Sequence, residues 1–163
     1  FRNNVTEGIT LRYISGNPLT GTKIDENGVL RAYHSQVTVI PEGKEVVEPL
    51  GWASLSPNRY SAGCTYPHLK PNPHKKFRLD ARIKGGQRAI IMSNEYDKVF
   101  PMDIFPEQLI KAIIAFNIDK MENLGIYEVA PEDFALCEFV DTSKLELQKI
   151  VRTGLDMLYK EME

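Results

Sequence analysis

Residues 16–23 are the first segment whose residue types and spacing could bind a phosphate. The segment holds two glycines, and the second is followed by Thr22 and Lys23. A P-loop needs its lysine directly after the second glycine and a hydroxyl residue after the lysine, so that the two side chains reach the phosphates and Mg²⁺. Here the two residues stand in the reverse order, Pro18 interrupts the loop, and no helical pattern follows. The segment therefore favours a turn between two strands over a nucleotide site.

The histidines and cysteines are too few and too scattered to suggest a metal site. His68 and His74 share a proline-rich loop, and His34 lies alone. A zinc site needs more Cys or His at short spacing, and Cys64 and Cys137 lie far apart in the sequence. We therefore expect solvent-exposed histidines, half-buried thiols and no metal ligand.

The sequence gives no support for a catalytic nucleophile. Residues 61–64, Ser-Ala-Gly-Cys, lack the glycine frame of a strand-to-helix nucleophile elbow. We expect no catalytic residue in this chain, and the pattern identifies no cofactor-binding residue.

The composition suits a folded domain of moderate size. The chain has 163 residues, of which 42% are hydrophobic and 26% charged, with a formal net charge of −2. This balance argues against a dedicated nucleic-acid binder, which carries a strong basic excess. No apolar run approaches the roughly 20 residues that cross a bilayer. The first residue is Phe1 rather than Met, so we expect a piece of a longer protein.

Charge is unevenly distributed along the chain. Residues 67–88 contain seven Lys and Arg against one acid, whereas residues 119–163 contain eleven acids against five bases. Solvated faces account for most such runs, and docking of the basic loop onto a partner or onto anionic lipid is the functional alternative. We expect residues 67–84 to be mobile alone and to become ordered against a partner.

The hydrophobic pattern of roughly the first hundred residues indicates β-strands. Residues 9–14 and 36–40 alternate apolar and polar side chains and end in turn-forming residues. The proline-rich residues 66–74 are expected to form a loop. Shorter strand candidates are residues 52–55, 59–61, 77–83 and 88–92.

The pattern changes to a helical period after about residue 100. Pro106 is placed to begin a helix, because the first turn does not use its missing N–H group. Asp119 with Glu122 predicts the cap of a short helix that Gly125 closes. The expected apolar stripe of the first helix is Leu109, Ile110, Ile113, Ile114 and Phe116.

Two further helices are predicted towards the end of the chain. Residues 131–133, Pro-Glu-Asp, predict one helix start. The capping box Ser143-x-x-Glu146 predicts a helix from about Lys144 to the end. The fold class is therefore α+β, with a β-rich region over residues 1–100 and a helical domain over 101–163. The expected stripe of the last helix is Leu147, Ile150, Val151, Leu155, Leu158 and Met162.

Residues 90–151 resemble a two-cluster iron–sulfur pattern that has lost its cysteines. In the C subunit of the Rnf electron-transport complex, two runs of the form C-x2-C-x2-C-x3-C-P ligate the clusters. Of the eight cysteines expected in this register, only Cys137 is present. The first run falls on Ile90, Ser93, Tyr96, Phe100 and Pro101, and the second on Pro131, Phe134, Cys137, Asp141 and Thr142.

The A subunits of Na⁺-translocating NADH:quinone oxidoreductases likewise lack the cluster-ligating cysteines while they keep the surrounding sequence. The chain resembles these subunits along nearly its whole length, most clearly in NEYDKVFPMD (94–103) and PEDFALCEFV (131–140). The resemblance implies a C-terminal fragment, in which residues 1–23 end a soluble-ligand-binding β-grasp domain and the helical part is ferredoxin-like without clusters. The other segments that carry the resemblance are residues 14–16, 19–23, 33–39, 51–53 and 143–144.

The same resemblance implies a function. Such a chain would be a peripheral, non-redox subunit of a respiratory pump that couples NADH oxidation and quinone reduction to Na⁺ export. It would lie at the cytoplasmic face of the bacterial inner membrane beside the membrane-embedded B subunit, with quinone nearby. NADH, flavins, an iron–sulfur centre and quinone would belong to the whole complex and no cofactor to this chain. A free-standing β-grasp module for a small soluble ligand is the alternative.

The former ligand positions carry a structural expectation as well. Ile90, Tyr96, Phe100 and Phe134 are large side chains, and we expect them to meet where clusters would lie and to be stabilised by apolar burial. Asp141 is expected at a helix start, near the backbone N–H groups ahead of Ser143.

Overall fold

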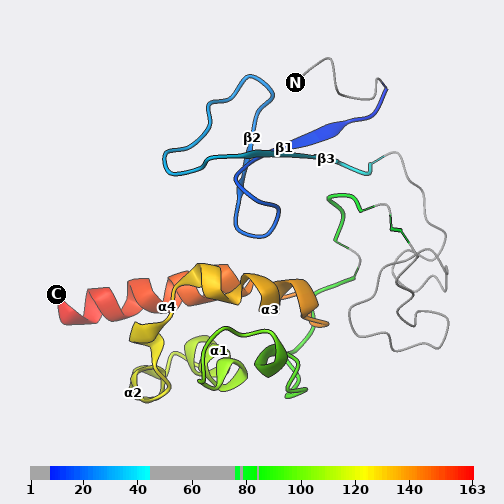
Figure 1. Ribbon diagram of the computed structural model, residues 1–163. Helices are drawn as coiled ribbons and strands as arrows, with labels where there is room; N and C mark the ends of the chain where they lie inside the picture. The colour runs from blue at the N-terminus through cyan, green and yellow to red at the C-terminus, as the bar shows by residue number, and fades with distance from the viewer. Residues whose placement is uncertain (1–7, 45–75, 78, 84) are drawn as a thin grey trace, which may run out of the picture. The chain divides into compact units, whose positions relative to one another are not determined.

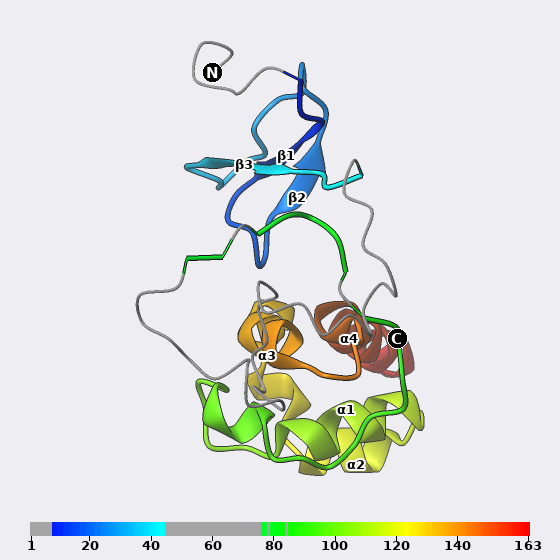
Figure 2. The ribbon, with the colours of Figure 1, turned by 90° about the vertical axis from the view of Figure 1, so that its right-hand side faces the viewer.

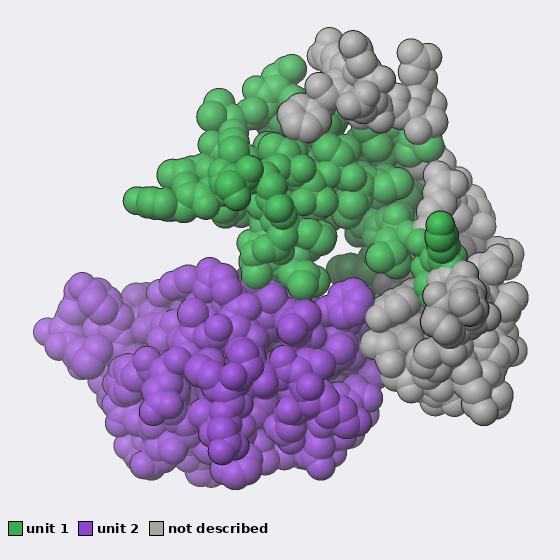
Figure 3. Space-filling model, in the orientation of Figure 1, with its two compact units in different colours: residues 1–85 green, residues 86–163 purple. Residues whose placement is uncertain are grey.

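The computed structural model describes residues 8–44, 76, 77, 79–83 and 85–163 (Figure 1). The chain divides into two compact units, Phe1–Gly85 and Gly86–Glu163 (Figure 3). In the described residues, the strands lie in the first unit and the α-helices in the second. The predicted α+β class is therefore confirmed, while the β-grasp and ferredoxin-like chain paths stay predictions.

The first unit contains a three-stranded antiparallel sheet in the order β2-β1-β3. Its strands are β1 (Leu11–Ser15), β2 (Thr22–Ile24) and β3 (Val37–Pro41). Tyr13 of β1 pairs with Ile24 on one side and with Val39 on the other. The two strongest strand predictions are confirmed as β1 and β3, and β2 was missed because three residues are too few for a visible alternation.

The other strand predictions fare differently. Residues 88–92 and the described part of residues 77–83 are not strands, so both predictions were wrong. Ala81 donates a single backbone hydrogen bond to Pro41, and Arg88 donates one to Ser143. Apolar residues of an extended segment can also pack on helices, as Ile90 does. The predictions for residues 52–55, 59–61, 66–74 and most of 67–84 lie outside the described residues.

The connection between β1 and β2 is the turn that the sequence predicts. The Asn17 side-chain oxygen accepts the N–H groups of Leu19 and Thr20, each at 2.8 Å. A Cβ atom on Gly21 would collide with the backbone oxygen of Asn17 and with Ile14, so this position requires glycine. The turn satisfies its own polar groups, as an Asx turn does.

The second unit packs four α-helices, α1 (Pro106–Ile114), α2 (Ile118–Asn123), α3 (Ala135–Val140) and α4 (Leu147–Met162). Three short 3₁₀ turns accompany them: η4 (Tyr96–Lys98) precedes α1, and η5 (Ile126–Glu128) and η6 (Pro131–Phe134) lie between α2 and α3. Within this unit, α3 and α4 form one layer and α1 and α2 the other (Figures 1 and 2). The predicted helix starts at Pro106 and Pro131 are confirmed.

The core of the second unit lies between α1 and α4. Its fully buried side chains come mainly from the two predicted stripes. Gly154 lets the helices approach closely, because a Cβ there would lie 3.1 Å from side-chain atoms of Ile113 and of Ile126. The members of this core with at most 2% exposure include Leu109, Ile110, Ile113, Met121, Ile126, Leu147, Val151 and Leu158.

Three members of the predicted stripes are exposed instead. Ile114 is 46% exposed, Phe116 70% and Met162 68%. Phe116 follows the end of α1 in the left-handed region, with φ 54°. Its N–H bonds to Ile113, and the next N–H bonds to Ala112, which closes the helix. The chain thus leaves the helical period before Phe116.

Two predicted caps were wrong. The N-cap of α2 is Asn117, whose side-chain oxygen accepts the N–H of Lys120 at 3.0 Å, rather than Asp119. Ser143 caps no helix, because its hydroxyl donates to the backbone oxygen of Ala89 at 3.1 Å, and α4 begins only at Leu147. The predicted closure at Gly125 is confirmed by its φ of 84°.

No helix within the described ranges combines the length and the apolar character that crossing a membrane would require.

An ion pair ties β1 to the end of β3 in the first unit. Both Nε and Nη2 of Arg12 donate to the Glu42 carboxylate at 2.7 Å, and Glu42 is only 8% exposed. Lys23 of β2 lies 3.7 Å from the same carboxylate. Hydrogen bonding to Arg12 lowers the pKa of Glu42 from 4.5 to about 2.

The Arg12–Glu42 pair should make the stability of the first unit depend on pH between about 4.5 and 2. The folded state binds the Glu42 proton more weakly than the unfolded chain, so the stabilisation is complete above about pH 4.5 and is lost as the pH falls towards 2. Arg12→Leu should therefore lower stability at neutral pH, and the difference from wild type should vanish near pH 2. Urea unfolding followed by NMR signals of β1 measures it.

Lys149→Leu is the matched control, because the Lys149–Glu146 pair is exposed on α4. It should leave the β1 signals unchanged at every pH. A difference between wild type and Arg12→Leu that stays constant from pH 7 to 2 would show that the pair contributes no acid dependence.

Candidate functional site

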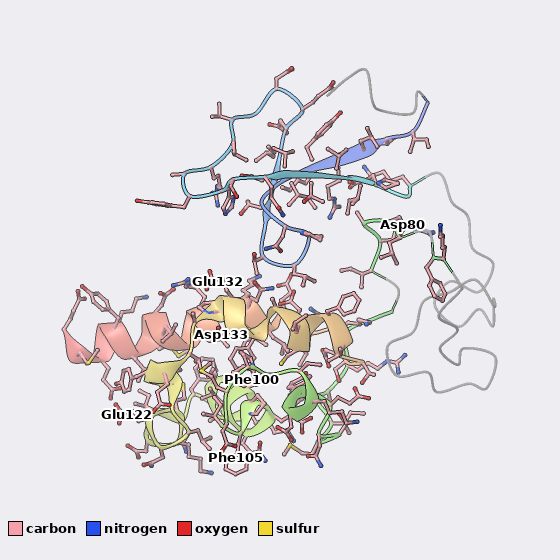
Figure 4. The ribbon with its side chains drawn as sticks, viewed as in Figure 1. Asp80, Phe100, Phe105, Glu122, Glu132 and Asp133 are labelled. Carbon is pink, nitrogen blue, oxygen red and sulfur yellow. The ribbon has the colours of Figure 1, made fainter. Side chains whose placement is uncertain are left out.

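Several positions that the resemblance to the Rnf C subunit aligns with cluster ligands meet inside the second unit. The rings of Phe100, which is labelled in Figure 4, and Phe134 pack with their centroids 4.7 Å apart and their planes tilted by 52°. Tyr96, Phe134 and Cys137 belong to the same buried cluster, and Ile90 packs against it. The expectation that large side chains fill this region is confirmed.

Short turns position these side chains. In η4, the N–H groups of Val99 and Phe100 both bond to the backbone oxygen of Tyr96. In η6, Asp133 accepts the N–H of Ala130 at 2.7 Å, and Phe134 leads directly into α3. Each turn thus fixes one aromatic side chain of the contact.

Tyr96 places a polar group in this apolar core. The residue is 2% exposed, and its hydroxyl makes no hydrogen bond to a protein atom. Burial, followed by the negative charge of Asp141, raises the pKa of Tyr96. The phenol therefore stays protonated at any physiological pH.

Backbone N–H groups satisfy the buried carboxylate of Asp141. It is 3% exposed, and its two oxygens accept the N–H of Ser143 at 3.0 Å and that of Leu145 at 2.7 Å. The expected bonding to N–H groups is confirmed, but these groups belong to the connection before α4 and not to the helix itself. Asp141 thus fixes the chain between α3 and α4.

Glu107 is a buried carboxylate that the sequence analysis missed. It lies in the first turn of α1 and is 2% exposed. One oxygen faces the N–H and the hydroxyl of Ser93 at 3.3 and 3.4 Å, and the other has no partner. An acid in the first turn of a helix is ordinarily solvated, so the sequence pattern does not predict that Glu107 is buried.

Cys137 is fully buried, not half-buried as predicted. Burial, then the charges of Asp97 and Asp141, raises the pKa of its thiol to about 12. A thiol in this state is a poor nucleophile and a poor metal ligand. Cys64 lies outside the described residues.

The single described histidine is not solvent-exposed, contrary to the prediction. His34 is half-buried, and its Nδ1 lies 2.8 Å from Oγ of Ser15. The same hydroxyl oxygen accepts the N–H of Arg31 at 3.0 Å. Ser15 is completely buried, so this pair holds the β2–β3 connection against β1. His68 and His74 lie outside the described residues.

The chemistry that these groups support is limited. In the part of the chain that the structure describes, no three His, Cys, Asp or Glu side chains are grouped so as to hold a metal ion. Glu107, Asp141 and Cys137 are buried. These three groups are therefore part of the packed core of the second unit.

The unpartnered hydroxyl leads to a stability prediction. Tyr96→Phe removes a buried polar group that has no hydrogen bond, so the free energy of unfolding should rise by about 1 kcal/mol. Tyr127→Phe is the control, because its exposed hydroxyl donates to Glu122 at 2.7 Å, and its loss should cost about 0.5 kcal/mol or less. Denaturant unfolding followed by circular dichroism at the helical band measures both. A loss of about 1 kcal/mol or more in Tyr96→Phe would show that the hydroxyl is bonded, with Asp141 as acceptor.

Comparison with known proteins identifies relatives of the whole chain. No protein-family model matches it. A protein of Neisseria meningitidis serogroup C is 36% identical over 152 residues, which cover 92% of this chain and 33% of the relative. The match to a Pasteurella multocida protein is 37% over 160 residues (98% and 35%), and to a Rhodopirellula baltica protein 34% over 158 residues (96% and 34%).

All three relatives are named as the A subunit of the Na(+)-translocating NADH-quinone reductase. The chain spans about a third of the length of these relatives. The resemblance seen in the sequence is thereby confirmed. Along nearly its entire length, the chain is homologous to about one third of these A subunits of the Na⁺-translocating NADH-quinone reductase.

Proposed function

We propose that this chain is the C-terminal third of an A subunit, where it serves as a structural, non-redox part of the sodium-pumping reductase. The observation that carries the proposal is identity of 34–37% over 92–98% of the chain to proteins of that name. The free-standing β-grasp module is less favoured, because the similarity extends through the helical unit as well.

The packing of the second unit supports a structural role. Phe100, Phe134 and the buried Cys137 occupy positions where the resemblance to the Rnf C subunit places cluster ligands. A protonated, enclosed thiol and two phenyl rings offer no redox chemistry. NADH, flavins, the iron–sulfur centre and quinone therefore belong elsewhere in the complex under this proposal.

The proposal also includes a place and partners. The chain would lie at the cytoplasmic face of the bacterial inner membrane, in contact with other subunits and chiefly with the membrane-embedded B subunit. Quinone would be handled nearby. No side chain of the described residues is proposed as catalytic, as a cofactor ligand or as a metal ligand.

Purification of the full-length subunit from its own membranes tests this function. A tagged subunit should bring the other subunits with it, together with NADH-driven quinone reduction. Phe134→Ala should reduce the amount of assembled complex strongly, because loss of a fully buried phenyl ring costs about 3–5 kcal/mol. Phe116→Ala is the matched control, since that ring is 70% exposed, and assembly should be unchanged.

Two results would contradict the proposal. One is a tagged subunit that purifies without other subunits. The other is a complex that keeps full quinone reductase activity although it lacks this subunit.

A further inference from the structure

Strand β3 forms one edge of the three-stranded sheet, because β1 lies between β2 and β3 (Figure 2). In an antiparallel pair, alternate residues direct their N–H and C=O groups towards the neighbouring strand and away from it. The N–H of Gly16 bonds to the backbone oxygen of Gln36 at 2.9 Å, so in this register the even-numbered residues of β3 bond to β1. The backbone groups of Val37, Val39 and Pro41 therefore point away from β1, along the open edge.

The open edge of β3 is short and uncharged. The backbone oxygen of Pro41 already accepts the N–H of Ala81 at 2.9 Å, and a proline has no N–H to offer. In the part of the chain that the structure describes, β1 is the only strand that pairs with β3. Val37 and Val39 thus present two N–H and two C=O groups at the spacing of a strand, without the charged side chain that usually discourages pairing at an edge.

The apolar face of the same sheet is incompletely covered. Residues directly opposite each other in an antiparallel register share a face, so Tyr13 lies beside Ile24 on one side and Val39 on the other. These three side chains are only half-buried. Among the described residues of the first unit, Ile14 is the only buried apolar side chain. Further chain over this face would be favourable, because burial of apolar surface stabilises a fold.

The length of the related proteins indicates which chain could provide a further strand. The relatives are about three times as long as the segment that matches this chain. Under the proposed function, the other two thirds belong to the same polypeptide and connect directly to the first unit. A segment of the same polypeptide has a high effective concentration at the β3 edge, which a separate protein does not have.

We infer that an extended segment from the other two thirds of the subunit pairs with Val37 and Val39 as a fourth strand of this sheet. Its backbone would bond to the four free N–H and C=O groups of β3. Its alternate apolar side chains would cover the face that carries Tyr13 and Val39. In strand addition of this kind, backbone bonds provide the affinity and alternate side chains the selectivity. The inference rests on the proposed function, because it assumes that this chain is part of a longer A subunit.

Hydrogen exchange in the full-length subunit tests whether the edge is paired. Mass spectrometry with fragmentation that resolves single amides follows the N–H groups of Val37 and Val39. Both should exchange at least about 100-fold more slowly than in the unfolded chain, because exchange then requires the added strand to detach. Exchange of both groups at the unfolded rate would overturn the inference.

Two substitutions at one position separate the backbone bond from the side chain. Val39→Pro removes an N–H that points away from β1, whereas Val39→Thr keeps the N–H and the shape and is the matched control. Val39→Pro should speed exchange at Val37 at least about tenfold, and Val39→Thr less than about threefold. Circular dichroism establishes that both variants fold. Equal exchange at Val37 in the two variants would contradict the inference.

Photocrosslinking in the full-length subunit identifies the strand. A benzophenone amino acid replaces Val37, and the same group at Lys23 of β2, on the opposite edge of the sheet, is the control. The expected product joins position 37 to the part of the subunit that precedes this chain. A product within this chain, a product with another subunit, or equal products from both positions would overturn the inference. A tagged subunit that purifies without other subunits would instead contradict the proposed function.

Discussion

The contact between Phe100 and Phe134 is the interaction on which the second unit depends. It joins two segments that are far apart in the sequence, the η4 turn with its extended flanks and the η6 turn that leads into α3. Short turns of this kind bury little surface by themselves, and in cluster proteins metal–thiolate bonds stabilise them. Here the fully buried Phe134 contributes about 1.5–3 kcal/mol. Under the proposed function, apolar side chains stand where the resemblance to the Rnf C subunit places cluster ligands, and their packing takes the place of metal–thiolate bonds.

The same core contains buried polar groups that are satisfied to different extents. Asp141 is stabilised by two N–H groups of the connection before α4. Glu107 is satisfied at one oxygen and Tyr96 at none, and such groups reduce stability by about 1–3 kcal/mol each. In the first unit, by contrast, the buried Glu42 has a bidentate partner in Arg12. The two units therefore differ in how they bury charge.

Local signals in the sequence predict part of this structure. Pro106 and Pro131 mark helix starts because a missing N–H is harmless there, and regular alternation identifies β1 and β3. The capping box predicted at Ser143 does not form, because the Ser143 hydroxyl donates its hydrogen bond to the backbone oxygen of Ala89, which is distant in the sequence. The burial of Glu107 and the pairing of Ser15 with His34 also depend on residues distant in sequence, which no local pattern reports. The aromatic core was predicted from the alignment of residues 90–151 with the cysteine runs of the Rnf C subunit. That alignment compares whole segments and does not depend on a local pattern.

Iron content combined with chelator sensitivity tests the central claim most directly, namely that apolar packing has replaced metal in the helical unit. The purified chain is analysed for iron, and its thermal unfolding is recorded by circular dichroism with and without a strong chelator. The account predicts a colourless protein, iron far below one atom per chain, and the same unfolding midpoint in both samples. Stoichiometric iron, or a midpoint that the chelator lowers strongly, would contradict it.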